Sequence, residues 1–251
     1  MVKVISVHSF RGGTGKSNFT ANLAVLAAAQ GKRVAVVDTD IQSPGIHVLF
    51  GMDEQAIQRS LNDYLWGRCT IAEAVYNVTP PAIAHTNGLV YFIPSSIKAG
   101  EIARILNEGY SVTLLNDGLR NLCKELNLDY LFIDTHPGLN KETLLSVAIS
   151  DGLVILLRPD RQDFQGTAVT LQVARKLDTP KTVLVVNKVL PSYNPEEVRE
   201  QISNKFQVPV AGVFPVCEEM IQLASGGIFS LEFPNHPYTA QLKKVAEQVI
   251  H

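Results

Sequence analysis

A glycine-rich segment behind an apolar, β-branched run constrains this chain more than any other feature. The run VKVISV is followed by HSFRGGTGKSN, residues 8–18, in which three glycines, an arginine, a lysine and a serine fall within seven residues. Glycine lets the backbone curl so that several N–H groups point at one anion, and a following helix adds the positive end of its dipole. The order of strand, loop and helix therefore predicts a phosphate-binding loop.

The rest of the chain alternates short apolar runs with longer helical patterns. Runs such as RVAVVD, YLFID and LVILL are apolar throughout, which is typical of strands buried on both faces of a parallel sheet. This alternation predicts an α/β fold, a doubly wound and mostly parallel sheet with helices on both faces. The expected strands are Val2–Val7, Arg33–Asp38, Leu89–Pro94, Tyr130–Asp134, Gly152–Leu157, Thr182–Asn187 and Val210–Phe214. The expected helices are Lys16–Gln30, Ser111–Leu126, Lys141–Ile149, Gln165–Leu177, Pro195–Phe206 and Tyr238–Ile250.

Length and composition favour one domain over residues 1–251. With 46 % apolar and 18 % charged residues, the chain has enough apolar side chains for a sizeable core, and no repeat or low-complexity linker divides it. The least regular stretch, Gly51–Asn87, contains the single tryptophan, Trp66, and a pair of short helices is expected there. It forms either a cap near the mouth of a site or plain connecting structure.

The cysteines and the hydropathy pattern point to a cytoplasmic protein. Cys69, Cys123 and Cys217 show no C-x-x-C spacing, which favours reduced core thiols over a metal site or a disulfide. The N-terminal sequence MVKVISVHSF lacks the features of a signal peptide, and no apolar run approaches the roughly 20 residues that span a bilayer.

Residues at the ends of the expected strands complete a nucleotide site. Lys16 would reach the β- and γ-phosphates of a nucleotide, and the hydroxyl of Ser17 would bind Mg²⁺. Asp38 and Asp40 lie at the end of one strand, and Asp134 ends another. Ligands of open parallel sheets bind at the carboxyl ends of the strands, where these acids fall. Carboxylates beside a phosphate indicate a metal ion between them or a base for attacking water.

Several motifs in order resemble the family of ATPases that includes the plasmid- and chromosome-partition ATPases and the cell-division site-selection ATPase of bacteria, the ParA/MinD family. Its deviant Walker A loop, K-G-G-x-G-K-[ST], reads RGGTGKS here, and its strand ending D-x-D reads VVDTDIQSPG. FIDTHPGL, VNK and FPVCEEMIQLASGG are similar to its later motifs. The resemblance covers nearly the whole chain.

This resemblance implies an ATP-dependent homodimer that sandwiches ATP and Mg²⁺ between two subunits and hydrolyses ATP slowly under stimulation by an adaptor protein. By position, Lys16, Asp40 and Arg11 would be catalytic, with Asp40 positioning or activating the attacking water. The implied metal site comprises Ser17, Asp38, Asp40 and Asp134. The implied nucleotide site comprises Arg11, Gly12, Gly13, Thr14, Gly15, Lys16, Ser17, Asn18, Asn187, Lys188, Pro215 and Val216, with Asn187 reading adenine.

Arg11 departs from the family pattern, in which the first lysine of the loop crosses the dimer interface. Arginine keeps the charge and suits phosphate, but it is bulkier and not interchangeable with lysine. Either Arg11 crosses as an arginine finger, which we favour, or it makes a structural ion pair and another basic residue crosses. The candidates for that second role are Lys141, Arg158 and Arg161. His136, in place of a more usual proline, touches the partner or merely caps a helix.

The sequence leaves open whether such a dimer binds a membrane or DNA. The final segment HPYTAQLKKVAEQVIH ends with a core helix rather than a basic amphipathic one, so a membrane anchor is not expected. Non-specific DNA is possible, and the protein would then be nucleoid-associated. The formal net charge of −2 also fits an ordinary solvated surface. The basic residues that would contact DNA are Arg175, Lys176, Lys181, Arg199, Lys205, Lys243 and Lys244.

Three other functions compete with an ATPase that positions a plasmid, a chromosome region, a protein cluster or a microcompartment. Iron–sulfur reductases share the loop, but they need cysteines at positions that this chain does not match, so no cluster is expected. A nucleotide-dependent, protein-binding regulator with negligible turnover is a second alternative, against which Asp38 and Asp40 argue. A membrane-associated regulator of the division site is the third.

Overall fold

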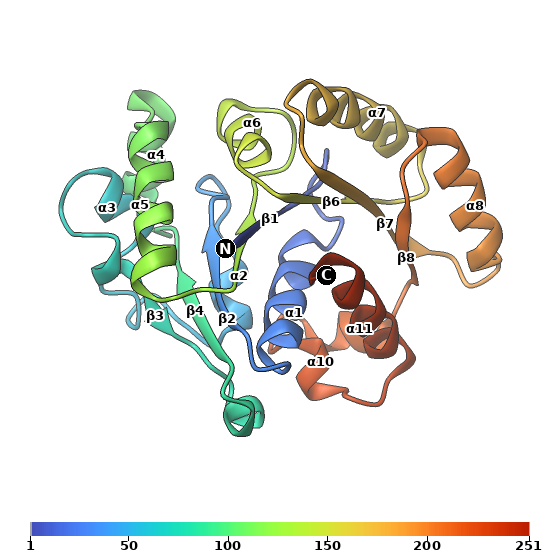
Figure 1. The fold of residues 1–251 in the computed structure, drawn as a ribbon, viewed down its shortest axis with the longest axis horizontal. Coiled ribbons are helices and arrows are strands. Elements are labelled where there is room, and N and C mark those ends of the chain that lie inside the picture. The colour runs from blue at the N-terminus through green and yellow to red at the C-terminus, as the bar shows by residue number, and fades with distance from the viewer. Residues whose placement is uncertain (1, 251) are drawn as a thin grey trace.

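A computed structural model describes residues 2–250 as one eight-stranded sheet with helices on both faces (Figure 1). The strand order is β3-β4-β2-β5-β1-β6-β7-β8, and every neighbouring pair is parallel except the short β3–β4 pair at one edge. The predicted doubly wound α/β fold is therefore confirmed. The strands are β1 (Lys3–His8), β2 (Arg33–Asp38), β3 (Tyr76–Asn77), β4 (Leu89–Ile93), β5 (Tyr130–Asp134), β6 (Gly152–Leu157), β7 (Lys181–Val189) and β8 (Val210–Pro215).

The helices divide between the two faces of the sheet, as Figure 1 shows. One face is covered by α1 (Lys16–Ala28), α10 (Phe229–Glu232) and α11 (Pro237–Ile250), which pack against each other and the sheet. The helices associated with the other face are α5 (Val112–Glu125), α6 (Lys141–Ala148), α7 (Arg161–Lys176) and α8 (Pro195–Phe206). Peripheral helices are α2 (Ile46–Leu49), α3 (Leu61–Leu65), α4 (Ala99–Glu108) and α9 (Glu218–Leu223), with 3₁₀ turns at Ala72–Ala74 and Pro81–Thr86.

The central strands are buried on both faces, as their uninterrupted apolar sequences predict. Along β2, Val34 and Val36 belong to the core under α1, whereas Ala35 and Val37 belong to the core on the opposite face. Side chains alternate across a strand, so both faces need apolar residues when helices cover both. The same alternation holds for β5 and β6, whose successive side chains belong to cores on opposite faces of the sheet.

The boundaries depart from the expected ones where short-range polar contacts decide them. α7 begins at Arg161, four residues before the expected start at Gln165, because the Asp160 carboxylate caps the helix by accepting from the N–H of Asp163. The irregular stretch Gly51–Asn87 holds α3, the two 3₁₀ turns and β3, a two-residue edge strand too short for a hydropathy pattern. Among the helices of residues 2–250, none combines the length and apolar character that crossing a membrane requires.

Candidate functional site

The glycine-rich segment forms the connection from β1 to α1. Gly13 and Gly15 have φ angles of 74° and 95°, in the left-handed region that glycine adopts without steric penalty. A Cβ on Gly15 would also lie 2.7 Å from Nδ2 of Asn187, so a side chain there would displace this amide. α1 begins at Lys16 and no side chain caps its first turn. The N-terminal N–H groups of this helix are therefore left for an anion.

Asp134, at the end of β5, accepts hydrogen bonds from three side chains of α1. One carboxylate oxygen accepts from Lys16 Nζ at 3.0 Å and from Thr20 Oγ1 at 3.0 Å. The other accepts from Ser17 Oγ at 2.7 Å. The Lys16 ammonium also lies 3.8 Å from Oδ2 of Asp40, and it is buried with only 7 % of its side chain exposed. A buried ammonium needs such paired carboxylates to offset its lost hydration.

Asp38 lies beside Asp134 in the sheet, because these two residues are register partners of β2 and β5. Its Oδ1 accepts from the N–H of Asp40 at 3.0 Å, and its Oδ2 is buried without a hydrogen-bond partner. Burial and the neighbouring Asp134 carboxylate raise the pKa of Asp38 well above its usual value. An unpartnered buried carboxylate oxygen is costly, and a cation or its bound water would satisfy it. These donors fit Mg²⁺, which prefers oxygen ligands and keeps several waters.

Asp40 joins the two acidic strand ends to a histidine. Its Oδ1 lies 2.6 Å from Nδ1 of His136 and 3.2 Å from the N–H of Ser43. His136 follows β5 and is about one-fifth exposed. Contact with Asp40 is a third role for this histidine, beside the partner contact and the helix cap considered from the sequence, and a lone histidine in a turn gave no signal of it.

The loop is fixed to the end of β7 through its carbonyl groups. Asn187 Nδ2 donates to the carbonyl of Thr14 at 2.8 Å, and Lys188 Nζ donates to the carbonyl of Gly13 at 2.8 Å. The hydroxyl of Thr14 is buried and has no partner. Anchoring the carbonyls leaves the N–H groups of the loop and this hydroxyl as donors, which fits a phosphate.

A cavity of about 200 Å³ opens beside the loop, between α1, the end of β7 and α11. Asn18, Asn187, Lys188, Met220, Ile221 and Tyr238 are among its lining residues. The hydroxyl of Tyr238 donates to Oδ1 of Asn187 at 3.3 Å, which orients the amide. Apolar walls with one oriented amide fit a planar heterocycle such as a nucleobase. The sequence indicated Asn187 but missed Tyr238, which is indistinguishable from core residues in a helical pattern.

Pro215 and Val216 lie next to this cavity rather than among the residues that line it. Both are exposed, and they line a neighbouring cavity of about 340 Å³ together with Cys217 and Tyr238. Tyr238 borders both cavities. The role expected of this backbone in the base pocket therefore stays a prediction.

Arg11 is held by the start of α7. Its Nη1 lies 2.5 Å from Oε1 of Gln162 and 3.4 Å from Oδ1 of Asp160, and its Nε lies 3.7 Å from Asp163. Arg158 shares these acids, with its Nε 3.0 Å from Asp163. The Asp163 carboxylate, only 2 % exposed, is thus paired with two guanidinium groups. Pairing with these acids raises the pKa of Arg158.

The two other basic candidates differ from Arg11 and Arg158 in their surroundings. Lys141 and Arg161 are exposed at the starts of α6 and α7. Within residues 2–250, neither has a carboxylate within ion-pair distance. Among the described residues, Arg11 and Arg158 are therefore paired with acids at the start of α7, whereas Lys141 and Arg161 make no ion pair.

A phosphate loop at the carboxyl edge of a parallel sheet, with three carboxylates beside its lysine and serine, defines a P-loop nucleotide-binding protein. Residues 2–185 match a family model described as an AAA domain. The chain is 27 % identical over 251 residues to an uncharacterized ATP-binding protein of Methanocaldococcus jannaschii, covering 100 % of this chain and 88 % of that protein. It is 29 % identical over 189 residues to an iron-sulfur cluster carrier protein of Methanococcus maripaludis, which is 73 % of this chain and 59 % of that protein.

Among solved structures, the fold is similar to the septum site-determining protein MinD of Pyrococcus horikoshii, which was solved in complex with Mg-ADP. The TM-score is 0.83 at 22 % identity, covering 99 % of this chain and 96 % of the other. The chain belongs to the ParA/MinD family of P-loop ATPases.

Proposed function

We propose that this protein is a slow ATPase whose 251 residues form one domain and whose ATP-bound form is a homodimer, with ATP and Mg²⁺ at the subunit interface. In this proposal an adaptor protein stimulates hydrolysis, and the cycle positions a cargo inside a cytoplasm. The observation that carries the proposal is the cluster of Lys16, Ser17, Asp38, Asp40 and Asp134. It combines phosphate-binding donors with carboxylates placed for a metal ion and an attacking water.

The residues of this cluster divide into three roles. Lys16 and Ser17 both donate to Asp134 in this structure; with MgATP bound, Lys16 would contact the phosphates and Ser17 would bind the metal ion. Asp38 and Asp134 would hold the ion or its waters. Asp40 orients the attacking water, which is the positioning that P-loop ATPases need most. Bound Mg²⁺ supplies charge neutralisation on the phosphate oxygens.

Arg11 is the residue that we propose to cross to the partner's phosphates. Its side chain is 37 % exposed and that of Asp160 is 42 % exposed, so this ion pair is partly solvated and costs little to release. The buried Asp163 would keep Arg158 as its partner, with Nε 3.0 Å away. The alternative is that Arg11 stays on α7 while Lys141 or Arg161, which are exposed, takes the crossing role. Single Arg11→Ala, Lys141→Ala and Arg161→Ala variants separate these routes, since only the crossing residue is needed for ATP-dependent dimerisation.

Turnover is tested by measuring phosphate release with MgATP. Wild-type protein should hydrolyse ATP slowly, and Asp40→Ala should reduce the rate by at least about tenfold while ATP still binds. Lys16→Ala should abolish binding as well, because the phosphates would lose the ammonium that the loop places beside them. Undetectable turnover in the wild type, with ATP bound, would instead identify the regulator with negligible turnover.

The absence of an iron–sulfur cluster is also part of this proposal. Cys69 and Cys123 contact the core cluster under α5, whereas Cys217 packs in the core cluster under α1, so the sheet separates their thiols. Protein reconstituted anaerobically with iron and sulfide should show no cluster absorption. A stable cluster spectrum would contradict the proposed role in cargo positioning and would favour a function like that of the iron–sulfur carrier relative.

A further inference from the structure

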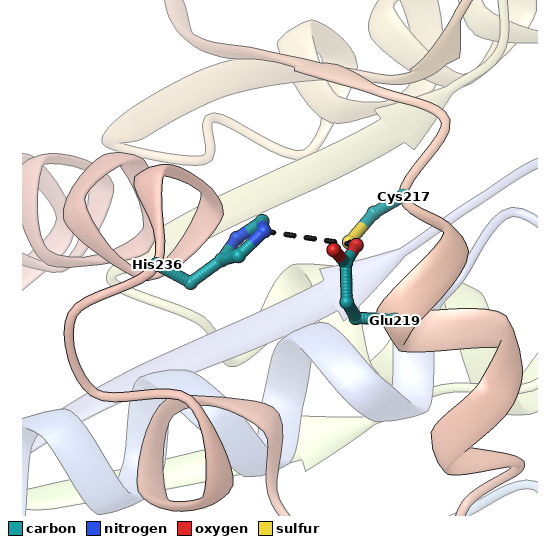
Figure 2. A group of neighbouring side chains, drawn as sticks. All are labelled: Cys217, Glu219 and His236. Carbon is teal, nitrogen blue, oxygen red and sulfur yellow. Dashed lines mark hydrogen bonds and ion pairs between the residues drawn. The ribbon is translucent and has the colours of Figure 1, made fainter.

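A cysteine, a glutamate and a histidine from two separate segments meet beside β8. Cys217 and Glu219 lie at the start of α9, and His236 precedes α11; Figure 2 shows their side chains pointing toward one another. Glu219 Oε2 lies 3.3 Å from Sγ of Cys217 and 3.6 Å from Nε2 of His236. All three donor atoms lie within 4.8 Å of each other. None of them belongs to the phosphate site.

These separations match those of ligands around one small cation. Metal–sulfur bonds of about 2.3 Å and metal–nitrogen or metal–oxygen bonds of about 2.0–2.2 Å place tetrahedral ligand atoms roughly 3.4–3.6 Å apart. The sulfur–oxygen and oxygen–nitrogen pairs are already at or close to this spacing. The sulfur and nitrogen atoms lie within 4.8 Å of each other, so a shift of at most about 1.4 Å would bring them to this spacing.

We infer that Cys217, Glu219 and His236 bind one zinc-like divalent cation. A thiolate, an imidazole and a carboxylate are the donors that Zn²⁺ and Co²⁺ select, whereas Mg²⁺ and Ca²⁺ take oxygen ligands. The three residues line a common cavity of about 340 Å³, so a fourth position faces open space. Three protein ligands and one open position leave room there for water or a small exogenous ligand.

Metal binding would change the protonation of the His236 ring and one of its hydrogen bonds. Its Nδ1 accepts from the N–H of Tyr238 at 3.1 Å, which leaves the ring proton on Nε2, facing Glu219. Binding of the cation releases the thiol proton of Cys217 and moves the ring proton of His236 to Nδ1, so the bond from Tyr238 is lost. Phe229 and Phe233 contact the imidazole edge-on, with ring centroids 5.3 and 6.4 Å away, and keep it beside the cavity.

Cobalt titration tests this site because Co²⁺ reports its ligands by absorption. Metal-free full-length protein in excess Mg²⁺, which occupies the oxygen-ligand site, should bind one equivalent of Co²⁺ with a thiolate charge-transfer band and tetrahedral d–d bands. Zn²⁺ should displace it. Cys217→Ser should abolish the charge-transfer band, and His236→Gln should weaken Co²⁺ binding beyond the roughly 10–100-fold typical of losing an outer-shell partner.

Cys69→Ser is the control, since it removes a thiol that lies outside the cluster and is at least as accessible as the buried Cys217. It should leave the spectrum and the affinity unchanged. Circular dichroism of each metal-free variant checks that the fold is retained, and His236→Gln, on a surface loop, serves if Cys217→Ser does not fold. Lack of a thiolate band in the wild type, or a band that survives both Cys217→Ser and His236→Gln, would overturn the inference.

Discussion

At the scale of single residues, the phosphate loop depends on one glycine more than on its neighbours. Gly15 combines a φ of 95° with a Cβ position 2.7 Å from Asn187, whereas a Cβ on Gly12 would meet nothing within 4 Å and its φ is not positive. Gly15→Ala should therefore lower the free energy of unfolding by about 1–3 kcal/mol. Gly12→Ala should change it by less than about 0.5 kcal/mol. Urea unfolding measures both, and equal costs would contradict this account of the loop.

His8 gives the fold a dependence on pH. Burial, with the positive Lys16 nearby, lowers the pKa of His8 to about 3, and its Nε2 has no hydrogen-bond partner. The unfolded chain binds a proton near pH 6.5 and the folded chain does not, so stability is lost as pH falls from about 6.5 toward 3, by at most roughly 1.4 kcal/mol per pH unit. His8→Asn should remove this part of the slope between pH 7 and 5.

The exposed His85 provides the control for that experiment. His85→Asn should leave the pH dependence of the unfolding free energy as in the wild type. Urea midpoints at several pH values give both slopes, and a wild-type slope in His8→Asn would show that His8 is not kept neutral by the fold.

At the scale of elements, the start of α7 both caps a helix and holds Arg11. Asp160 accepts from the N–H of Asp163 at 2.9 Å and lies 3.4 Å from Arg11. Asparagine caps helices as well as aspartate does, but carries no charge. Asp160→Asn should therefore keep the unfolding free energy within about 0.5 kcal/mol, whereas Asp160→Ala should lose about 1 kcal/mol. Chemical denaturation distinguishes them, and equal losses would assign the stabilisation to the ion pair instead.

Regular elements could be predicted because their signals are local. β2, β5 and β6 coincide with the expected runs, since strands buried on both faces must be apolar throughout. Short elements such as β3 and α9 could not, because two to six residues carry no periodicity. The same limit applies to the site: Lys16, Ser17 and Asp134 follow motifs, but Tyr238 reaches Asn187 only through the packing of α11 on α1 and β8.

Contacts between residues that are far apart in the sequence could not be predicted from sequence spacing. Cys217 alone predicts a buried thiol, and it is 9 % exposed. Its neighbour His236 is brought beside it by the turn between α10 and α11. Likewise, Arg11 meets Asp160 and Asp163 only because β1 and β6 are adjacent in the sheet, an adjacency that depends on strand order.

At the scale of the whole molecule, the basic residues considered for DNA binding are unequally available. Arg175 and Lys181 donate to the carbonyls of Phe206 and Gln248, whereas Lys243 and Lys244 are exposed on α11. If DNA is the surface that carries the dimer, co-sedimentation should occur with ATP but not ADP and weaken steeply with salt, because phosphate neutralisation releases counterions. The double variant Lys243→Ala, Lys244→Ala should bind DNA more weakly than the wild type at the same salt concentration. No binding under any condition would exclude DNA in favour of a protein scaffold.

ATP should join two copies of this chain, and the mass of the protein in solution measures this directly. Light scattering on the slowly hydrolysing Asp40→Ala variant should give the 27.5 kDa monomer with ADP and about twice that mass with MgATP. Arg11→Ala in the same background should stay monomeric in both. A monomer with MgATP in Asp40→Ala and in the wild type, under conditions where ATP binding is saturated, would contradict the account.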